Sequence, residues 1–517
     1  MPITYEMATP SVVSGWQALP TRERLLEVAK ILVLPAICLL PILLTLPFMN
    51  EPFDRDEGAY ATIAQGLLRG DVPYRDYFDH KPPLIYVWYA FSFLAFGEGI
   101  VAPRLTAALV WSATALLVYA EASLLFSRRI ALTAAALFAL SSALAMLQAS
   151  ANTEAFMLLP LTASLYAATR GLKRESWRWI ALAGGLGALA VLTKQVAVIN
   201  IAALGAFCVS YAALDGEWRR AMKWTSALIG GFAAVVAVCL LPFVLTGSLG
   251  DFIYANFTYN RIYTNEISFR ERMALERAGT YYFLMAATPF VATAMMACLQ
   301  RAFHWRSGLA FLVIVWVVAS QAGVMLSGRA FPHYYVALLP PLAILAGWYV
   351  ANALLVARPK PLAICAVGLA LIVSVLFNSS AFLAKSPNDR HLARFPDSYA
   401  ASQLVSGPVA ARITALTTPN QAIYNYGRET QLYFYANRRP AIRFMYDRPF
   451  SLDPPTFDEA MNDLRKVRPI LIVDSVSALT EQGWDAQHPA ALREFLASEY
   501  EFVGRVEFAD FYRLKGP

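Results

Sequence analysis

The sequence is poor in charged residues for its length. Only 15% of its 517 residues are Asp, Glu, Lys or Arg, whereas 58% are hydrophobic and the mean hydropathy is +0.47. Soluble domains usually carry about a quarter charged residues, so this composition excludes an ordinary soluble protein and predicts a multi-span membrane protein. The net charge of +7 is dispersed over short loops. It therefore indicates membrane topology and argues against a nucleic-acid-binding surface.

Cysteine and nucleotide-binding motifs are equally sparse. The cysteines are odd in number, lie in apolar runs and form no C-x-x-C pair, which excludes a disulfide framework and a thiolate metal site. They are Cys38, Cys208, Cys239, Cys298 and Cys365. No G-x-x-x-x-G-K-[ST] sequence and no strand-linked G-x-G-x-x-G occurs, so a cytosolic nucleotide is not expected as a substrate.

Long apolar runs dominate the first three quarters of the chain. A spanning helix needs about 20 mostly apolar residues. The first run, 31–49, is longer than the apolar core of a signal peptide and is expected to be an uncleaved span. The segment 83–97 is too short to cross and is expected to be an interfacial or re-entrant helix. The expected spans are 31–49, 103–126, 130–148, 154–169, 178–193, 195–214, 223–245, 279–299, 307–326, 334–356 and 361–383.

The positions of the basic residues test this count of crossings. With the N-terminus inside, every inner loop is short and basic, as the positive-inside rule requires. A span at 83–97 would place these clusters outside. In this topology the outer side of the membrane contains the loops 50–82 and 246–278, the short segments 148–154 and 329–335, and everything after about residue 384. The protein is expected in the plasma (inner) membrane, with its active site and C-terminal domain on the periplasmic or extracellular side.

After residue 384 the composition becomes that of a soluble domain. The segments 421–426 and 469–473 have the pattern of short strands, and 457–467 and 490–500 have helical spacing. The predicted fold is an all-α polytopic membrane domain with a small C-terminal α/β domain. The expected boundaries are 1–30 for a cytoplasmic N-terminal segment, 31–383 for the transmembrane domain and 384–517 for the soluble domain.

The first outer loop contains the strongest candidate for a catalytic acid. Asp54 and Glu57 have the spacing of a helix capping box, which gives both a structural role. Asp56 has no capping role and shares a helix face with Tyr60, four residues further on. An acid near membrane depth is costly unless it is used, so Asp56 is predicted to be functional. Glu57 is kept as a second catalytic candidate beside its capping role.

Lys81 precedes two prolines that indicate the start of a helix, so it is expected at or beside the N-cap. A lysine is a poor N-cap and adds positive charge to the positive end of a helix dipole. Such a misfit favours an anion site. The alternative is a lysine that reaches up to the membrane interface.

Further polar residues lie at other outer helix ends. Lys194, Arg329 and His333 could form a cationic rim around a phosphate at the bilayer surface, although each alone is more often an interfacial anchor. Glu154 is a second outer acid at a helix start, where a favourable position in the first turn is an equally good explanation. No outer histidine cluster has metal-ligand spacing.

These motifs resemble those of the GT-C glycosyltransferases that use polyprenyl-phosphate sugars. The resemblance is to the bacterial branch related to aminoarabinose-lipid A transferases and protein O-mannosyltransferases, and covers about residues 30 to 383. The motifs that carry it occur in the expected order and are Asp56-Glu57-x-x-Tyr60, His80-Lys81-Pro82-Pro83, Thr193-Lys194 and His333-Tyr334-Tyr335.

The resemblance implies a GT-C fold with juxtamembrane helices in the first outer loop. It also implies that Asp56 matches the acid at the acceptor, and that Lys81 and Lys194 match phosphate-contacting lysines. The aminoarabinose transferases carry an acid where this chain has His80, and an arginine where it has Ala59. Because of these departures no metal site is transferred: no cofactor is assigned, and a divalent metal stays open.

The expected activity is transfer of a monosaccharide from a polyprenyl-phosphate donor to a hydroxyl of a cell-surface acceptor. Asp56 would act as general base, and Lys81 and Lys194, with Arg329 or His333, would stabilise the departing phosphate. Expected partners are the lipid-linked sugar, membrane lipids and a glycan, glycolipid or protein acceptor, with no nucleic acid. The rivals are a transporter or flippase of a lipid-linked or anionic substrate, which would place charges near mid-membrane on repeated halves, and a non-catalytic scaffold.

Overall fold

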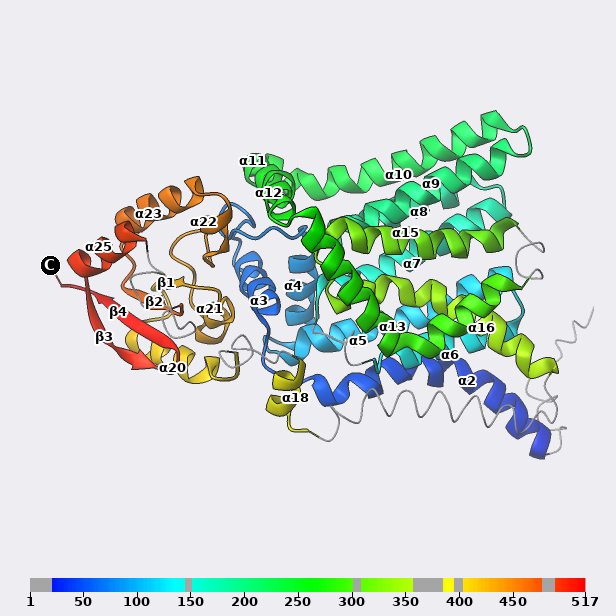
Figure 1. The fold of residues 1–517 in the computed structure, drawn as a ribbon, viewed down its shortest axis with the longest axis horizontal. Coiled ribbons are helices and arrows are strands. Elements are labelled where there is room, and N and C mark those ends of the chain that lie inside the picture. The colour runs from blue at the N-terminus through cyan, green and yellow to red at the C-terminus, as the bar shows by residue number, and fades with distance from the viewer. Residues whose placement is uncertain are drawn as a thin grey trace, which may run out of the picture.

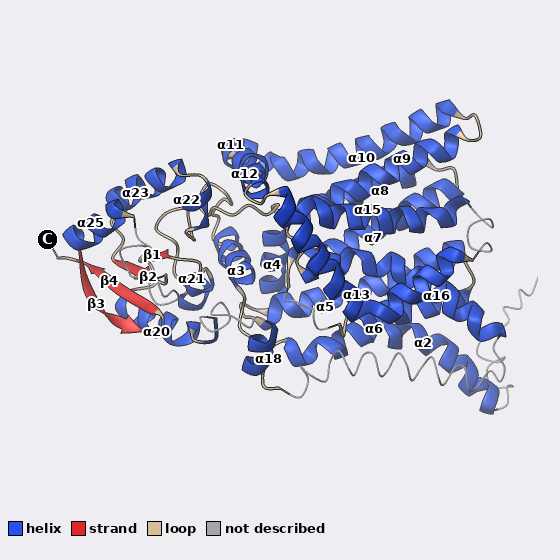
Figure 2. Cartoon of the chain, viewed as in Figure 1, coloured by secondary structure: helices blue, strands red, loops and turns tan. Residues whose placement is uncertain are grey.

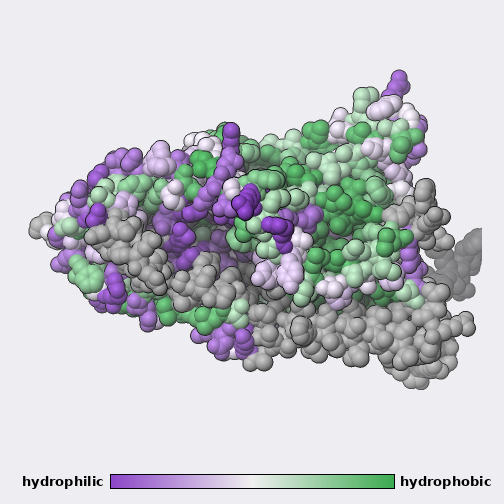
Figure 3. All heavy atoms as spheres, in the orientation of Figure 1, coloured by the Kyte–Doolittle hydropathy of each residue, from purple (hydrophilic) through white to green (hydrophobic). Residues whose placement is uncertain are grey.

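The computed structural model describes residues 21–144, 151–300, 308–356, 385–394, 403–476 and 489–516. A bundle of long helices and a smaller part with a sheet lie end to end, with short helices between them (Figures 1 and 2). The hydrophobic surface gathers over the bundle and the hydrophilic surface over the smaller part (Figure 3). A surface of this kind on long helices suits lipid on the bundle and water on the rest.

Ten of the predicted spans each contain a helix, and the eleventh, 361–383, lies outside the described residues. Within the described ranges, seven helical stretches are long and apolar enough to cross a membrane. The predicted spans 130–148, 154–169 and 178–193 contain helices that are not among those seven. The chain is a multi-pass membrane protein. The helices of these ten predicted spans are α2 (Thr21–Thr45), α5 (Val101–Leu125), α6 (Arg128–Ser141), α7 (Thr153–Lys173), α8 (Trp177–Thr193), α9 (Val198–Ala213), α10 (Trp218–Leu245), α13 (Phe269–Leu299), α15 (Phe311–Ser327) and α16 (Leu339–Val356).

Small residues allow these helices to pack closely. A Cβ atom on Gly184 of α8 would overlap the carbonyl of Leu228 in α10, and one on Gly231 of α10 would overlap the carbonyl of Ala181. In a bilayer, where lipid is as apolar as leucine, such backbone contact is a main source of helix association.

The two ends of the bundle differ in charge. The connections α5–α6, α7–α8 and α9–α10 lie at the end away from the sheet (Figure 1). Basic residues that the sequence assigns to inner loops lie there, among them Arg128, Arg129, Lys173 and Arg219. The opposite end, here named the site end, carries the short helices and the C-terminal part.

Two short helices lie across the site end, between the bundle and the sheet (Figure 1). They are α3 (Arg55–Leu68) and α4 (Leu84–Phe96). The 13 residues of α4 rise about 20 Å, which is too little for a hydrocarbon core of about 30 Å. Residues 83–97 are therefore a juxtamembrane helix, and this prediction is confirmed. Other short elements here are η1 (Leu46–Phe48), η2 (Gln195–Ala197), α11 (Leu249–Ile253), the π-helical turn η3 (Tyr254–Thr258), α12 (Tyr259–Asn265) and η5 (Pro332–Leu338). The short helix η4 (Gly308–Ala310) lies at the opposite end, beside the last turn of α9.

The C-terminal part is built around a four-stranded sheet of order β1-β2-β4-β3. β1 and β2 are parallel, and the other neighbouring pairs are antiparallel. Both predicted strands and both predicted helices are present. The strands are β1 (Ile423–Tyr426), β2 (Leu471–Asp474), β3 (Tyr500–Val506) and β4 (Ala509–Leu514), and the helices are α18 (Pro387–Arg394), α20 (Ser406–Leu416), α21 (Gln431–Ala436), α22 (Arg448–Leu452), α23 (Pro455–Val467) and α25 (Ala490–Glu499).

The proposed boundary at residue 384 adjoins 357–384, which lies outside the described residues, and the domain limits stay a prediction.

The C-terminal part packs directly on the first turns of α3. The Arg55 side chain donates to the buried Glu429 carboxylate at 2.9 Å, and Thr430 Oγ1 donates to the Arg55 carbonyl at 2.5 Å. Gly58 lies against Gln431, where a Cβ would come within 2.6 Å of the Gln431 Cβ and backbone nitrogen. The helix that carries Asp56 and Glu57 is thus held from the membrane side and from the C-terminal side.

Replacing Gly58 by Ala is expected to lower the free energy of unfolding, because the added methyl group must push α3 and α21 apart. Overpacking of this kind costs about 1–3 kcal/mol, more than the ~1 kcal/mol gained in helix propensity. The thermal midpoint in detergent measures the effect. The matched control is Gly407→Ala in α20, where nothing lies within 4 Å and stability should hold or rise. Equal midpoints for the two variants would contradict the close packing.

Candidate functional site

The N-terminus of α3 carries the predicted capping box. Asp54 Oδ1 accepts a hydrogen bond from the Glu57 amide at 2.8 Å, and the Asp54 amide donates to Glu57 Oε2 at 3.2 Å. The capping prediction is confirmed. The carboxylates of the neighbouring residues Asp56 and Glu57 consequently point to different surroundings.

Glu57 is fully buried and bound on both carboxylate oxygens. Arg104 of α5 donates to Glu57 Oε2 at 2.6 Å and to Oε1 at 3.2 Å, and the Ala151 amide donates to Oε1 at 2.7 Å. The same guanidinium donates to the Pro52 carbonyl at 2.9 Å. Glu57 therefore joins α3, α5 and the start of α7.

Asp56, by contrast, is open to solvent, with 49% of its side chain exposed. Its Oδ2 lies 3.6 Å from Lys81 Nζ and 3.5 Å from the Tyr60 hydroxyl. Tyr60 itself is buried. Three of the predicted site residues are thus in contact, and one of them is a carboxylate that a substrate can reach.

Lys81 is held by the loop before α4. This helix begins at Leu84 with Pro83 as its N-cap, so Lys81 lies two residues before the cap and not at it. Its carbonyl accepts hydrogen bonds from Tyr74 at 2.8 Å and Tyr86 at 3.3 Å. The expectation that Lys81 lies at or beside the N-cap is therefore wrong by one residue, because both prolines precede the first helical residue.

Asp79, which the sequence did not single out, organises the residues before Lys81. It is buried and accepts hydrogen bonds from the His80 amide at 2.7 Å and from the Tyr86 hydroxyl at 3.0 Å. The His80 ring presents Nδ1 to Asp79 Oδ1 at 3.3 Å and Nε2 to Lys81 Nζ at 3.4 Å. Asp79, His80 and Lys81 thus form one chain of contacts that ends at Asp56.

The charge states follow from these contacts. Burial lowers the pKa of His80, and the positive charge of Lys81 lowers it further, which keeps the ring neutral at pH 7. Burial alone would raise the pKa of Asp79, but the hydrogen bond with His80 and the charge of Lys81 hold it below its usual value. Burial opposes the charge of Lys81 as well, yet the neighbouring Asp56 carboxylate raises the pKa of this lysine. The site therefore contains a neutral imidazole between a carboxylate and an ammonium group.

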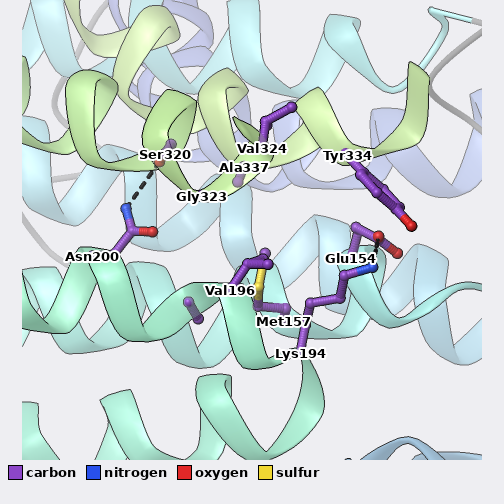
Figure 4. A pocket seen from close by; sticks show the side chains of 11 residues that line it. Glu154, Met157, Lys194, Val196, Asn200, Ser320, Gly323, Val324, Tyr334 and Ala337 are labelled. Atoms are coloured by element: carbon purple, nitrogen blue, oxygen red, sulfur yellow. Dashed lines mark hydrogen bonds and ion pairs between the residues drawn. The ribbon is translucent and has the colours of Figure 1, made fainter. Parts of the chain in front are cut away.

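A second ion pair lies where α7, α8 and η5 meet. Lys194 is the C-cap of α8, and its ammonium group contacts the Glu154 carboxylate of α7 (Figure 4). The Tyr334 ring lies 4.0 Å from Lys194 Nζ, and His333 Nε2 lies 3.9 Å from Glu154 Oε1. Lys194 and Glu154 are both buried. Four predicted residues from three parts of the sequence are brought together here.

An apolar groove leads from this ion pair into the bundle. It is narrow, with a cavity volume of about 10 Å³ between α7, α9, α15 and the segment 332–338 (Figure 4). Asn200 donates to Ser320 Oγ at 2.9 Å at the inner end of the groove. A second cavity of about 20 Å³, also lined by Asn200, lies between α7, α9 and α15. The groove thus combines a cation at its mouth with apolar walls along its length.

Arg329 lies apart from both ion pairs, on the side of the C-terminal part. It donates to Glu266 Oε2 at 2.5 Å and covers the Tyr263 ring at 4.4 Å. Arg448 of the C-terminal part contacts the same Glu266 carboxylate. The structure places Arg329 in this bridge and shows no direct contact with Lys81 or Lys194.

Two amides fix the backbone beside Lys81. Asn260 donates to the His80 carbonyl at 2.8 Å and Gln195 donates to it at 3.3 Å. In the sequence both amides stand beside apolar or aromatic residues, which only weakly indicates that their side chains are buried and hydrogen-bonded. Neither residue was predicted, since only the folded chain brings α12 and η2 to the first loop.

A metal does not fit the residues that the structure describes. Within those ranges, no group of three or more His, Cys, Asp or Glu side chains is arranged to hold a metal ion. Glu154 already has Lys194 as its partner and Asp56 has Lys81. No chemical step below is routed through a metal.

Comparisons with known proteins agree on the fold. Residues 80–245 match the family model described as dolichyl-phosphate-mannose-protein mannosyltransferase. No curated protein matches the sequence.

Solved structures match over most of the chain. The crystal structure of ArnT from Cupriavidus metallidurans bound to undecaprenyl phosphate is 17% identical with a TM-score of 0.58, covering 93% of this chain and 97% of that one. The archaeal oligosaccharyltransferase AglB from Archaeoglobus fulgidus, in complex with an inhibitory peptide and a dolichol-phosphate, is 13% identical with a TM-score of 0.53, covering 86% and 69%. The Archaeoglobus fulgidus oligosaccharyltransferase in complex with Zn and sulfate is 16% identical with a TM-score of 0.54, covering 86% and 67%.

Because the match with ArnT covers 93% of this chain, it extends over both the helical bundle and the C-terminal part. With these matches, the chain has the fold of the GT-C glycosyltransferases.

Proposed function

We propose that this protein is a membrane glycosyltransferase that moves a monosaccharide from a polyprenyl-phosphate donor to a hydroxyl group of a cell-surface acceptor. The observation that carries the proposal is the meeting of a half-exposed carboxylate, Asp56, with the buried ammonium of Lys81 at 3.6 Å. A base that can reach solvent beside a fixed cation is what an attacking hydroxyl and a departing phosphate require.

The donor phosphate is assigned to the cations of the site end. Lys81 and Lys194 are both largely buried, where their charge acts on a phosphate more strongly than it would in water. The narrow groove beyond Lys194 has mostly apolar walls, so it matches a polyprenyl chain in polarity. ArnT, bound to undecaprenyl phosphate, and AglB, bound to a dolichol-phosphate, support a lipid phosphate as the ligand class.

The proposed reaction is a single displacement with inversion. Asp56 takes the proton of the acceptor hydroxyl while its oxygen bonds to the anomeric carbon. The bond between that carbon and the phosphate oxygen breaks, and the electron pair leaves with the polyprenyl phosphate. Lys81 and Lys194 stabilise the negative charge that develops on the departing phosphate.

The other predicted residues hold Asp56, Lys81 and Lys194 in place or have a structural role. Tyr60 contacts Asp56, and His80 contacts the Lys81 ammonium through Nε2. Glu154, with His333 and Tyr334, holds Lys194 in place. Glu57 is assigned a structural role because its carboxylate is buried against Arg104, and Arg329 a role in joining the C-terminal part to the bundle.

The site end is assigned to the periplasmic or extracellular face of the plasma (inner) membrane. The basic connections of the bundle lie at the opposite end, and the positive-inside rule places such connections in the cytoplasm. The acceptor is then a lipopolysaccharide, another surface glycan or a protein hydroxyl.

The test is release and transfer of sugar by the purified protein in proteoliposomes. Supplied with a radiolabelled polyprenyl-phosphate sugar and an extract of surface acceptors, the protein should transfer label and release polyprenyl phosphate. Movement of the intact lipid across the bilayer without cleavage would support a flippase instead. Neither cleavage nor movement would support a scaffold.

Removing the charge of Lys81 should reduce turnover strongly. Lys81→Met keeps the length of the side chain, and loss of one group that stabilises the transition state costs about 10²–10³-fold in kcat. Initial rates of polyprenyl phosphate release measure the effect. The control is Lys466→Met on the exposed face of α23, which should not change the rate. A Lys81→Met protein with a rate within threefold of wild type would refute the assignment.

A further inference from the structure

A tyrosine from the C-terminal part reaches the chain of contacts that holds Lys81. The Tyr446 hydroxyl lies 3.4 Å from Asp79 Oδ1 and 3.3 Å from His80 Nδ1. No other side-chain group of the C-terminal part contacts Asp79 or His80 among the interactions of the described residues. Tyr446 is therefore a link between the soluble part and the proposed phosphate site.

The segment that carries Tyr446 is docked firmly on the first loop. The Phe78 amide donates to the Arg443 carbonyl at 2.6 Å, and Phe78 and Phe444 form an isolated β-bridge. The rings of Phe78 and Phe444 are buried with their centroids 5.3 Å apart. This contact fixes the position of the Tyr446 hydroxyl relative to His80, two residues after Phe78.

The hydrogen-bonding groups determine the direction of each contact. The Asp79 carboxylate can only accept, so the Tyr446 hydroxyl donates to it. The hydroxyl oxygen and Asp79 Oδ1 are then the acceptors available to His80 Nδ1, which must carry the imidazole hydrogen. The other ring nitrogen, Nε2, is left as an acceptor and faces the Lys81 ammonium at 3.4 Å. One hydroxyl thus helps select the tautomer that can receive a hydrogen bond from Lys81.

We propose that Tyr446 is a positioning residue for sugar transfer, which holds His80 in the orientation and tautomer that place Lys81 beside Asp56. The inference rests on the proposed function, because it acts on the lysine assigned to the donor phosphate. The C-terminal part is accordingly a component of the catalytic site and not only a cap on the membrane domain.

The first test compares two Tyr→Phe variants that each remove one hydroxyl from the same interface. Tyr446→Phe should lower kcat about 5- to 10-fold and weaken binding of polyprenyl phosphate by a similar factor, which is the size expected for one ordinary hydrogen bond. The matched control is Tyr254→Phe, which removes a hydrogen bond from η3 to Asp453 of the C-terminal part and does not touch His80. It should leave kcat and lipid affinity within twofold of wild type.

A double-mutant cycle then separates positioning from general loosening of the interface. If Tyr446 acts through His80, Tyr446→Phe should cost less than twofold in kcat in a His80→Ala background, although it costs 5- to 10-fold alone. Equal factors in both backgrounds would overturn the proposal. A Tyr446→Phe protein that retains wild-type kcat and affinity would also overturn it. A Tyr446→Phe protein that fails to fold would do the same: the phenyl ring fills the same space, so misfolding would show that the hydroxyl is needed for folding.

The controls keep this inference apart from the proposed function. If wild-type protein transfers sugar and Asp56→Asn does not, but Tyr446→Phe behaves like wild type, only the inference fails. If wild-type protein does not cleave the donor, the proposed function itself fails.

Discussion

Asp56→Asn is expected to reduce sugar transfer by about 10²–10⁴-fold, the usual contribution of a general base, without loss of folded protein. The amide has nearly the same shape as the carboxylate but cannot take the proton of the acceptor hydroxyl. Half of the Asp56 side chain is exposed, and its contacts are one ion pair and one long hydrogen bond. Substitution at such a position changes stability by about 0.5 kcal/mol or less.

Two measurements check this expectation. Initial transfer rates in proteoliposomes report the chemistry, and the thermal midpoint reports folding. The control is Asp76→Asn in the same loop, where the carboxylate pairs with Arg75 and does not contact Lys81. Transfer by the Asp56 variant at more than a tenth of the wild-type rate would remove Asp56 from the role of base.

Arg104→Met is expected to have the largest effect on stability, a loss of about 3–5 kcal/mol. The substitution leaves the Glu57 carboxylate, which is 0% exposed, buried without its counter-charge. It also removes the donor to the carbonyl of Pro52, in the segment that leads into α3. The free energy of unfolding, or the yield of folded protein where unfolding is irreversible, measures the loss.

The partner substitution distinguishes the loss of this ion pair from a general effect of the methionine side chain. Glu57→Gln combined with Arg104→Met removes both charges, so it should recover part of the stability lost in the single variant. If Glu57 were instead the catalytic base, Glu57→Gln alone would abolish transfer while leaving folding intact. The buried ion pair predicts the reverse, a less stable protein whose folded fraction still transfers sugar.

Several features of the site could be predicted from the sequence because they depend on local spacing. The capping box needs only residues three apart, and it separated Asp54 and Glu57 from Asp56 without tertiary information. The juxtamembrane helix 84–96 was predictable because its length is too small for a bilayer. The place of Lys81, expected at or beside the N-cap, was wrong by one residue, because neither proline is the first helical residue.

Other features depend on residues far apart in the sequence. Arg104 lies 47 residues from Glu57, and Tyr446 lies 367 residues from Asp79. Neither residue has a local pattern that indicates its partner. Asp79 stands in an ordinary polar loop, and nothing within that loop shows that a carboxylate there will be buried among tyrosine hydroxyls.

The sequence by itself determined the membrane character of this protein, the positions of most helices and the short list of charged residues that required an explanation. These follow from hydrophobicity, length and the cost of placing charge near lipid, which act along the chain. Only the tertiary structure decided which carboxylate is buried, which lysine meets which acid and that the C-terminal part reaches the site. Those outcomes depend on helix packing and on hydrogen bonds between distant segments, which the order of residues does not reveal.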